Sequence, residues 1–134
     1  MPVSKSYAAH ALDLLRLAGP VQVRSLFGGM GLYLDGAMFG LLDDDELFLK
    51  ADELTEDHFV SAGCAAWVYP SPKGPMQTHY FRPPDAALDD AESMLPWAQW
   101  AIEAGRRAQA AKASKKKRRK SAVPKGIGRK TRRR

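Results

Sequence analysis

The 134-residue chain is long enough for one domain with its own core, and 45% hydrophobic residues argue against disorder of the whole chain. No stretch approaches the roughly 20 apolar residues of a transmembrane helix, and the N-terminus lacks a signal-peptide pattern. Cys64 is the single cysteine, which excludes an intramolecular disulfide, argues against a metal cluster and predicts a cytoplasmic protein. The net charge of +6 divides unevenly: residues 1–105 hold six basic and fifteen acidic residues, a net charge of −9, whereas residues 106–134 carry +15.

A helix is predicted at the start of the chain. Ser6 is its candidate N-cap, and Gly19–Pro20 ends it. The predicted apolar face has helical spacing and consists of Tyr7, Ala11, Leu14, Leu15 and Ala18.

Four strands are predicted next, as a meander. Alternating polarity and short apolar runs place them over residues 21–27, 30–34, 37–42 and 46–51. Asp35–Gly36 is a strong hairpin signal, because both positions of a type I′ turn need positive φ. Asp43–Glu46 predicts a second turn. A cation site is less favoured there, because a calcium loop spaces its ligands at alternate positions and includes a glycine.

A short helix is predicted after the meander. Thr55 is its candidate N-cap, Leu54 is expected to pack against Phe59, and Gly63 ends the helix. Two further strands are predicted over residues 65–70 and 76–83, around a turn rich in proline and glycine.

The last predicted element is a C-terminal helix. Asp89 or Asp90 begins a helical turn, and Pro96 is expected in the first turn of the main helix, where a proline costs least. The apolar pattern ends near Ala113, so the basic sequence beyond it is expected to be disordered in isolation. These elements predict an α+β domain over residues 1–110: an antiparallel sheet of five to six strands, meander plus hairpin, packed with N- and C-terminal helices, followed by a flexible basic tail over residues 111–134.

The glycines between Ser25 and Leu42 raise the question of a phosphate-binding loop. Such a loop lies between a strand and a helix, whereas this stretch is followed by a strand. The sequence therefore predicts that Gly28–Gly29 form a turn or bulge and that Gly40 allows close approach of a neighbouring backbone or side chain.

The segment "RSLFGGMGLYLDGAMFGLLDDDELFLKAD" (Arg24–Asp52), with "HYFRPP" and a final helix bearing tryptophans, resembles the TfoX/Sxy N-terminal domain family over about residues 5–108. The resemblance implies a compact α+β domain with a role in regulating natural competence, where family members assist transcription together with the cyclic-AMP receptor protein. The full-length regulators add a second helical domain, and this chain has a basic tail instead. No catalytic residue is implied.

Four residues match the opening motif of that family and form a possible partner surface: Arg24, Phe27, Gly28 and Gly29. Tyr80 and Arg82, on the strand at His79–Arg82, are included in this possible partner surface and, if they point outward, are also candidates to stack on or pair with nucleic acid. The three histidines, His10, His58 and His79, lack metal-ligand spacing, so neither a metal nor a cofactor is expected.

The tail has the clearest chemistry, because runs of cations bind phosphates without reading sequence by releasing condensed counterions. The candidate nucleic-acid-binding residues are Lys115, Lys116, Lys117, Arg118, Arg119, Lys120, Arg129, Lys130, Arg132, Arg133 and Arg134. No hydrophobic anchor adjoins them, so no membrane partner is expected.

The leading hypothesis is a non-enzymatic regulator that binds nucleic acid through the tail and a protein partner in transcription through the domain. Two alternatives remain: a protein-interaction module with a solubilising tail, and an enzyme with a site near Gly28–Gly29 and His79. The tail is also free to fold back on the acidic domain. DNA versus RNA and the oligomeric state stay open.

Overall fold

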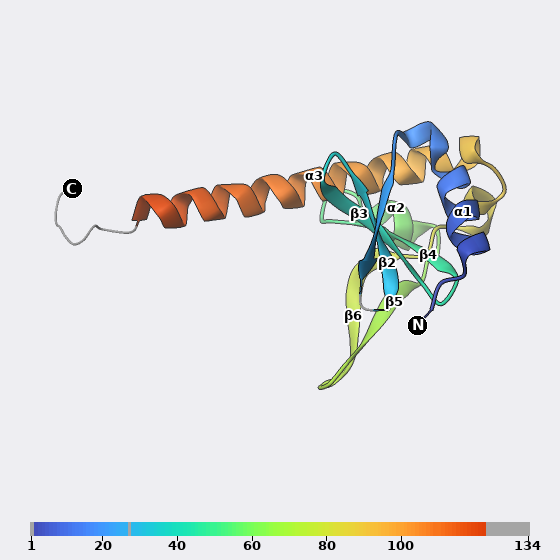
Figure 1. The fold of residues 1–134 in the computed structure, drawn as a ribbon, viewed down its shortest axis with the longest axis horizontal. Helices are drawn as coiled ribbons and strands as arrows, with labels where there is room; N and C mark the ends of the chain where they lie inside the picture. Colours follow the sequence, from blue (N-terminus) through green and yellow to red (C-terminus); the bar gives the residue numbers. More distant parts are fainter. Residues whose placement is uncertain (1, 27, 123–134) are drawn as a thin grey trace.

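The computed structural model describes residues 2–26 and 28–122, with side chains described as far as Lys116. Its centre is a six-stranded antiparallel sheet with the strand order β1-β2-β3-β4-β6-β5. The strands are β1 (Gln22–Leu26), β2 (Gly29–Leu34), β3 (Ala37–Asp43), β4 (Glu46–Lys50), β5 (Ala66–Ser71) and β6 (Gly74–Phe81). The predicted α+β class, with a meander followed by a hairpin, is confirmed (Figure 1).

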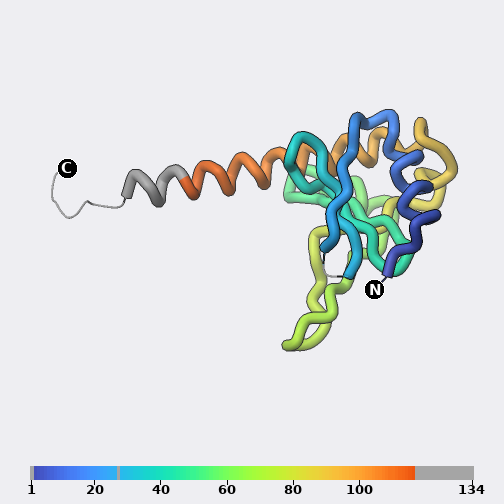
Figure 2. The backbone as a smooth tube through the Cα atoms, viewed as in Figure 1, coloured from blue at the N-terminus to red at the C-terminus, as the bar shows by residue number. Residues whose placement is uncertain are grey.

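Three helices complete the fold: α1 (Lys5–Leu14), α2 (Glu56–Ser61) and α3 (Ala91–Ala122). Short 3₁₀ turns lie at Arg16–Ala18 and Asp85–Leu88. α3 runs past the sheet and continues beyond it, while the β5–β6 hairpin projects away from the other strands (Figures 1 and 2).

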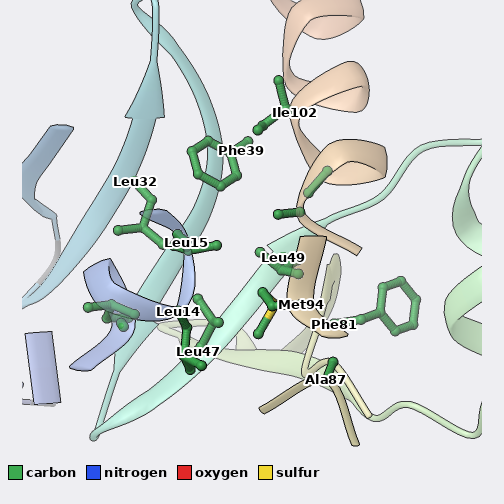
Figure 3. Packing of buried hydrophobic residues seen from close by; sticks show 14 of the residues in the cluster. Leu14, Leu15, Leu32, Phe39, Leu47, Leu49, Phe81, Ala87, Met94 and Ile102 are labelled. Atoms are coloured by element: carbon green, nitrogen blue, oxygen red, sulfur yellow. The ribbon is translucent and has the colours of Figure 1, made fainter. Parts of the chain in front are cut away.

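The main core lies between α1, α3 and one face of the sheet. Residues paired across strands share a face, so Leu32 opposite Gly40, Gly40 opposite Leu49, and Leu49 opposite Phe81 place these side chains together. Figure 3 shows strand, α1 and α3 side chains converging in this core, among them Leu15, Leu32, Phe39, Met94 and Ile102.

The glycines of the meander shape the backbone, as predicted. Asp35 and Gly36 have φ of 52° and 81°, which fits the predicted type I′ turn, and Gly28 has φ of 82°. A Cβ on Gly29 would collide with the Leu42 carbonyl oxygen, and one on Gly40 would lie 2.9 Å from the Phe48 carbonyl oxygen. These positions bring neighbouring strands close together.

The predicted cap of the first helix was wrong, whereas Thr55 is the N-cap residue of α2 as predicted but makes no capping hydrogen bond with its side chain. Ser4, two residues before Ser6, caps α1 by accepting a hydrogen bond from the Tyr7 backbone N–H. At α2, the Thr55 side chain makes no capping hydrogen bond. The Asp52 carboxylate instead accepts from the Leu54 and Thr55 backbone N–H groups, so the helix is entered through a turn that begins three residues earlier.

The expected contact of Leu54 with Phe59 is also corrected, because Leu54 is 67% exposed. Phe59 is buried and instead packs against Phe81 and the edge of Trp97.

The C-terminal helix differs from the prediction at both ends. Asp90 caps it, accepting from the Ser93 backbone N–H at 2.7 Å, so the turn at Asp89–Asp90 and the main helix form one element and Pro96 lies inside it. At the other end α3 continues to Ala122, past the expected end near Ala113. Alanine, lysine and arginine are strong helix formers, so the backbone stays helical where the apolar pattern has stopped.

Candidate functional site

The face of the sheet opposite the main core forms a second layer of side chains, which we call the outer face. Its members alternate with core residues along each strand, and they are paired across strands, as are Leu41 with Phe48 and Lys50 with Tyr80. Leu41 and Phe48 are buried on the outer face, although α1 and α3 pack on the opposite face of the sheet.

An aromatic cluster accounts for this burial. Trp67 contacts Phe48, Tyr69 and Tyr80, with ring centroids 6.1, 5.6 and 6.4 Å away. The Trp67 indole N–H donates to the Asp43 carboxylate at 3.1 Å, which fixes the ring beside β3. Offset and edge-on ring pairs of this kind stabilise beyond the area that they bury.

Two cations lie over tyrosine rings at the end of the outer face nearest the β2–β3 turn. The Arg24 guanidinium is 4.7 Å from the Tyr33 ring centroid, and the Lys50 ammonium is 5.0 Å from that of Tyr80. Burial lowers the pKa of Lys50, with the nearby Asp52 opposing the shift. Burial, and then the Tyr33 phenol, raise the pKa of Tyr80.

Between this end of the outer face and α3 lies a cavity of about 370 Å³, which we call the tyrosine–lysine hollow. The sheet contributes Tyr33, Ala37, Met38, Lys50 and Tyr80, the β2–β3 turn contributes Gly36, and α3 contributes Gly105, Ala108, Gln109 and Lys112. None of these lining residues is acidic, although residues 1–105 carry a net charge of −9.

Three polar contacts hold α3 against the sheet beside the hollow. Arg107 makes a bidentate ion pair with Asp52, with N–O distances of 2.6 and 3.0 Å. Arg106 lies 3.5 Å from the Asp35 carboxylate, and the Gln109 amide donates to the Gly36 carbonyl oxygen. The Arg107 hydrogen bond lowers the pKa of Asp52. The acids nearest the hollow are therefore engaged by arginines.

The candidate partner surface is spread over the fold. Arg24 is exposed on the edge strand β1, and Gly28 and Gly29 lie where β1 leads into β2. Tyr80 is half-buried in the aromatic cluster, and Arg82 is ion-paired with Glu46 and Asp85 at 3.3 and 2.9 Å. Phe27 lies outside the described residues.

The candidate nucleic-acid-binding residues begin on the exposed part of α3. Lys115 and Lys116 are exposed there, where the helix has left the sheet (Figure 1). Lys117, Arg118, Arg119 and Lys120 belong to the helix by their backbone, but their side chains lie outside the described part. Wholly outside it are Arg129, Lys130, Arg132, Arg133 and Arg134.

The residues of the enzyme alternative are not brought together. A pocket of about 70 Å³ lies beside Gly29, and His79 is not among its lining residues. The exposed His79 instead lies 3.7 Å from Glu56 of α2. Over residues 2–26 and 28–122, no group of three or more His, Cys, Asp or Glu side chains is placed to hold a metal, and no helix is long and apolar enough to cross a membrane.

The sequence alone does not reveal the hollow, because Tyr33, Lys50 and Lys112 lie far apart in the chain. A partial signal was present in Phe48 and Lys50, which alternate with the core residues Leu47 and Leu49 and therefore face away from the helices.

Comparison with known proteins gives two findings. A family model described as the TfoX N-terminal domain matches residues 13–105. The curated protein "DNA transformation protein TfoX1" of Aliivibrio fischeri is 28% identical over 112 residues, which are 84% of this chain and 54% of that protein. The chain thus spans about half the length of this curated relative.

Proposed function

Because the chain belongs to the TfoX N-terminal domain family, we propose that it is a competence-related regulatory protein without catalytic activity, whose basic C-terminal segment binds nucleic acid independently of sequence. The A. fischeri relative is named for DNA transformation, and we extend that process to this chain. A regulator of transcription acts where the chromosome lies, so the proposal places the protein in the bacterial cytoplasm.

The observation that carries the proposal is the division of charge along α3. Arg106 and Arg107 are paired with domain carboxylates, whereas the lysines from Lys112 onward are exposed as far as side chains are described. A domain of −9 repels nucleic acid, and the segment that follows it carries +15. The helix therefore directs its cations away from the acidic surface and toward a polyanion.

The domain supplies the protein contact in this proposal. Val68 and Met76 are 52% and 53% exposed on opposite faces of the projecting β5–β6 hairpin (Figure 2). A partner that closes around the hairpin would cover both side chains.

The test is duplex DNA binding by the full chain across a salt series. We expect log K to fall steeply with log salt, and K115Q/K116Q to reduce that slope by about 0.9 for each phosphate that the variant no longer neutralises. Glutamine keeps a good helix propensity, so the substitution removes charge and leaves α3 intact.

The matched control is K5Q/K73Q, which removes two exposed cations from the domain. It should leave the salt slope unchanged. If both double variants lower the slope equally, or if the wild-type chain does not bind duplex DNA at physiological salt, the nucleic-acid part of the proposal is wrong.

A further inference from the structure

The tyrosine–lysine hollow is a different site from the duplex contact that the proposed function assigns to Lys115 and Lys116, although Lys112, at the start of the basic segment, forms part of its lining. Its walls come from four neighbouring strands, the β2–β3 turn and α3, so it is formed by the folded domain itself. Its volume of about 370 Å³ lies within the range of about 300–1,000 Å³ typical of small-molecule sites.

The lining has the chemistry of a site for an organic anion. Lys50 and Lys112 bring two ammonium groups, Tyr33 and Tyr80 bring phenol rings with hydroxyl donors, and Gln109 brings an amide. Of the acids that would repel an anion, Asp52 is held in a bidentate ion pair by Arg107, and the exposed Asp35 lies 3.5 Å from Arg106.

The burial of Lys50 is hard to explain by stability alone. Lys50 is half-buried without an ion pair at contact distance among the described residues, and its ammonium lies over the Tyr80 ring. Partly desolvating a lysine costs free energy, and an anion bound beside it would offset that cost.

We propose that the tyrosine–lysine hollow binds a nucleoside phosphate, with the phosphate at Lys50 and Lys112 and the base against the tyrosine-lined wall. Aromatic rings combined with lysines are the usual means of holding a base and its phosphate together. A bare phosphate would leave the apolar part of the lining, Ala37, Met38 and Ala108, without a partner.

The nucleoside phosphate has two sources: a free nucleotide, or one nucleotide of a single-stranded nucleic acid. The backbone of a single-stranded nucleic acid could continue from the hollow along α3, because Lys115 and Lys116 lie three and four residues after Lys112 on the same side of the helix. The duplex binding proposed above is not required for either source.

The test is calorimetric titration of the full chain with thymidine 5′-monophosphate, thymidine, inorganic phosphate and a thymidylate hexamer. We expect saturable binding of the monophosphate and at least about tenfold weaker binding of thymidine and of phosphate. Lys50→Gln and Lys112→Gln should each weaken monophosphate binding by about tenfold, as expected when one charge-assisted hydrogen bond is removed. Lys50→Arg should retain most of it.

Lys73→Gln on the β5–β6 turn is the matched control and should change the affinity by less than about twofold. Lys112 is on an exposed helix surface, so its variant reports on the hollow even if Lys50→Gln perturbs folding. If the hexamer binds at least about tenfold more tightly than the monophosphate, the ligand is a single-stranded nucleic acid. If the two affinities are equal, the ligand is a free nucleotide.

The proposal is overturned if neither the monophosphate nor the hexamer binds at millimolar concentration, if phosphate alone binds as tightly, or if Lys73→Gln weakens binding as much as Lys112→Gln. Failure here is separable from failure of the proposed function, because K115Q/K116Q should lower duplex binding and leave monophosphate affinity unchanged.

Discussion

Asp52 joins three parts of the fold through one carboxylate. It accepts hydrogen bonds from the backbone at the start of α2, from the Thr55 hydroxyl and from Arg107 of α3. Its position after β4 therefore links the sheet to both helices, beside the hollow.

Asp52→Asn should destabilise the domain at neutral pH by about 1–2 kcal/mol, since Arg107 is partly exposed and the pair is only partly desolvated. Arg107 lowers the pKa of Asp52 in the folded state. The contribution of the Asp52 carboxylate to the free energy of unfolding is therefore complete above the ordinary Asp pKa of about 3.9, and it is lost as pH falls through the lowered pKa. Urea unfolding at several pH values between 7 and 3 should show that the difference in free energy of unfolding between wild type and Asp52→Asn becomes smaller as the pH falls.

Glu53→Gln is the matched control, because Glu53 is the exposed neighbouring acid. It should have little effect at any pH. If the free energies of unfolding of wild type and Asp52→Asn differ by the same amount at pH 7 and at pH 3, the ion pair does not stabilise the fold.

The capping hydrogen bonds at the start of α2 show what local sequence leaves open, because Thr55 is the N-cap residue but the Asp52 side chain accepts these bonds. Both side chains carry an oxygen that can cap a helix, and they lie three residues apart. The Asp52 carboxylate that makes the capping bonds also accepts from Arg107, a residue 55 positions away. No pattern near Thr55 contains that information.

The backbone of α3 lies close to the sheet at Gly105. A Cβ at this position would lie 2.5 Å from the Met38 carbonyl oxygen and 3.3 Å from the Cβ of Phe39. The glycine lets the helix backbone rest on β3, and it thereby sets one wall of the hollow.

Gly105→Ala should therefore lower the free energy of unfolding, although the same change at an exposed helix position raises it by about 1 kcal/mol. Thermal unfolding should show a lower Tm for Gly105→Ala. Gln99→Ala, at an exposed position on the same helix, should be nearly neutral. A Tm increase for Gly105→Ala would mean that α3 shifts away from β3 at little cost.

The strands were predictable because their signals are local. Period-two alternation and Asp35–Gly36 place β1, β2 and β3 without knowledge of the rest of the fold. The C-terminal end of α3 was not predictable in this way, because its basic part has no apolar pattern and depends on intrinsic helix propensity. The hollow combines side chains from β2, β3, β4, β6 and α3, so it requires the tertiary fold.

At the scale of the whole molecule, the described part of the chain consists of a packed domain and a helix that extends beyond it. α3 is buried against the core at Ala98, Ala101 and Ile102, whereas residues 110–116 are exposed throughout. Helical hydrogen bonds without tertiary packing open readily.

Amide hydrogen exchange should therefore divide α3 in two. Amides up to Gln109, which still bonds to the β2–β3 turn, should be protected with the domain. Those of residues 112–122 should exchange orders of magnitude faster, with free energies of opening near zero. Uniform protection along α3 would show that the extension is packed against something, such as a second copy of the chain.

The length of this extension also sets an electrostatic distance. At about 1.5 Å per residue, the helix from Gln109 to Ala122 is about 20 Å long, more than two Debye lengths of about 8 Å at physiological salt. A phosphate backbone held at the far end of α3 would feel little of the negative field of the domain. The acidic surface would then remain available for other contacts while the cations are engaged, and one chain could carry two opposite charges without either cancelling the other.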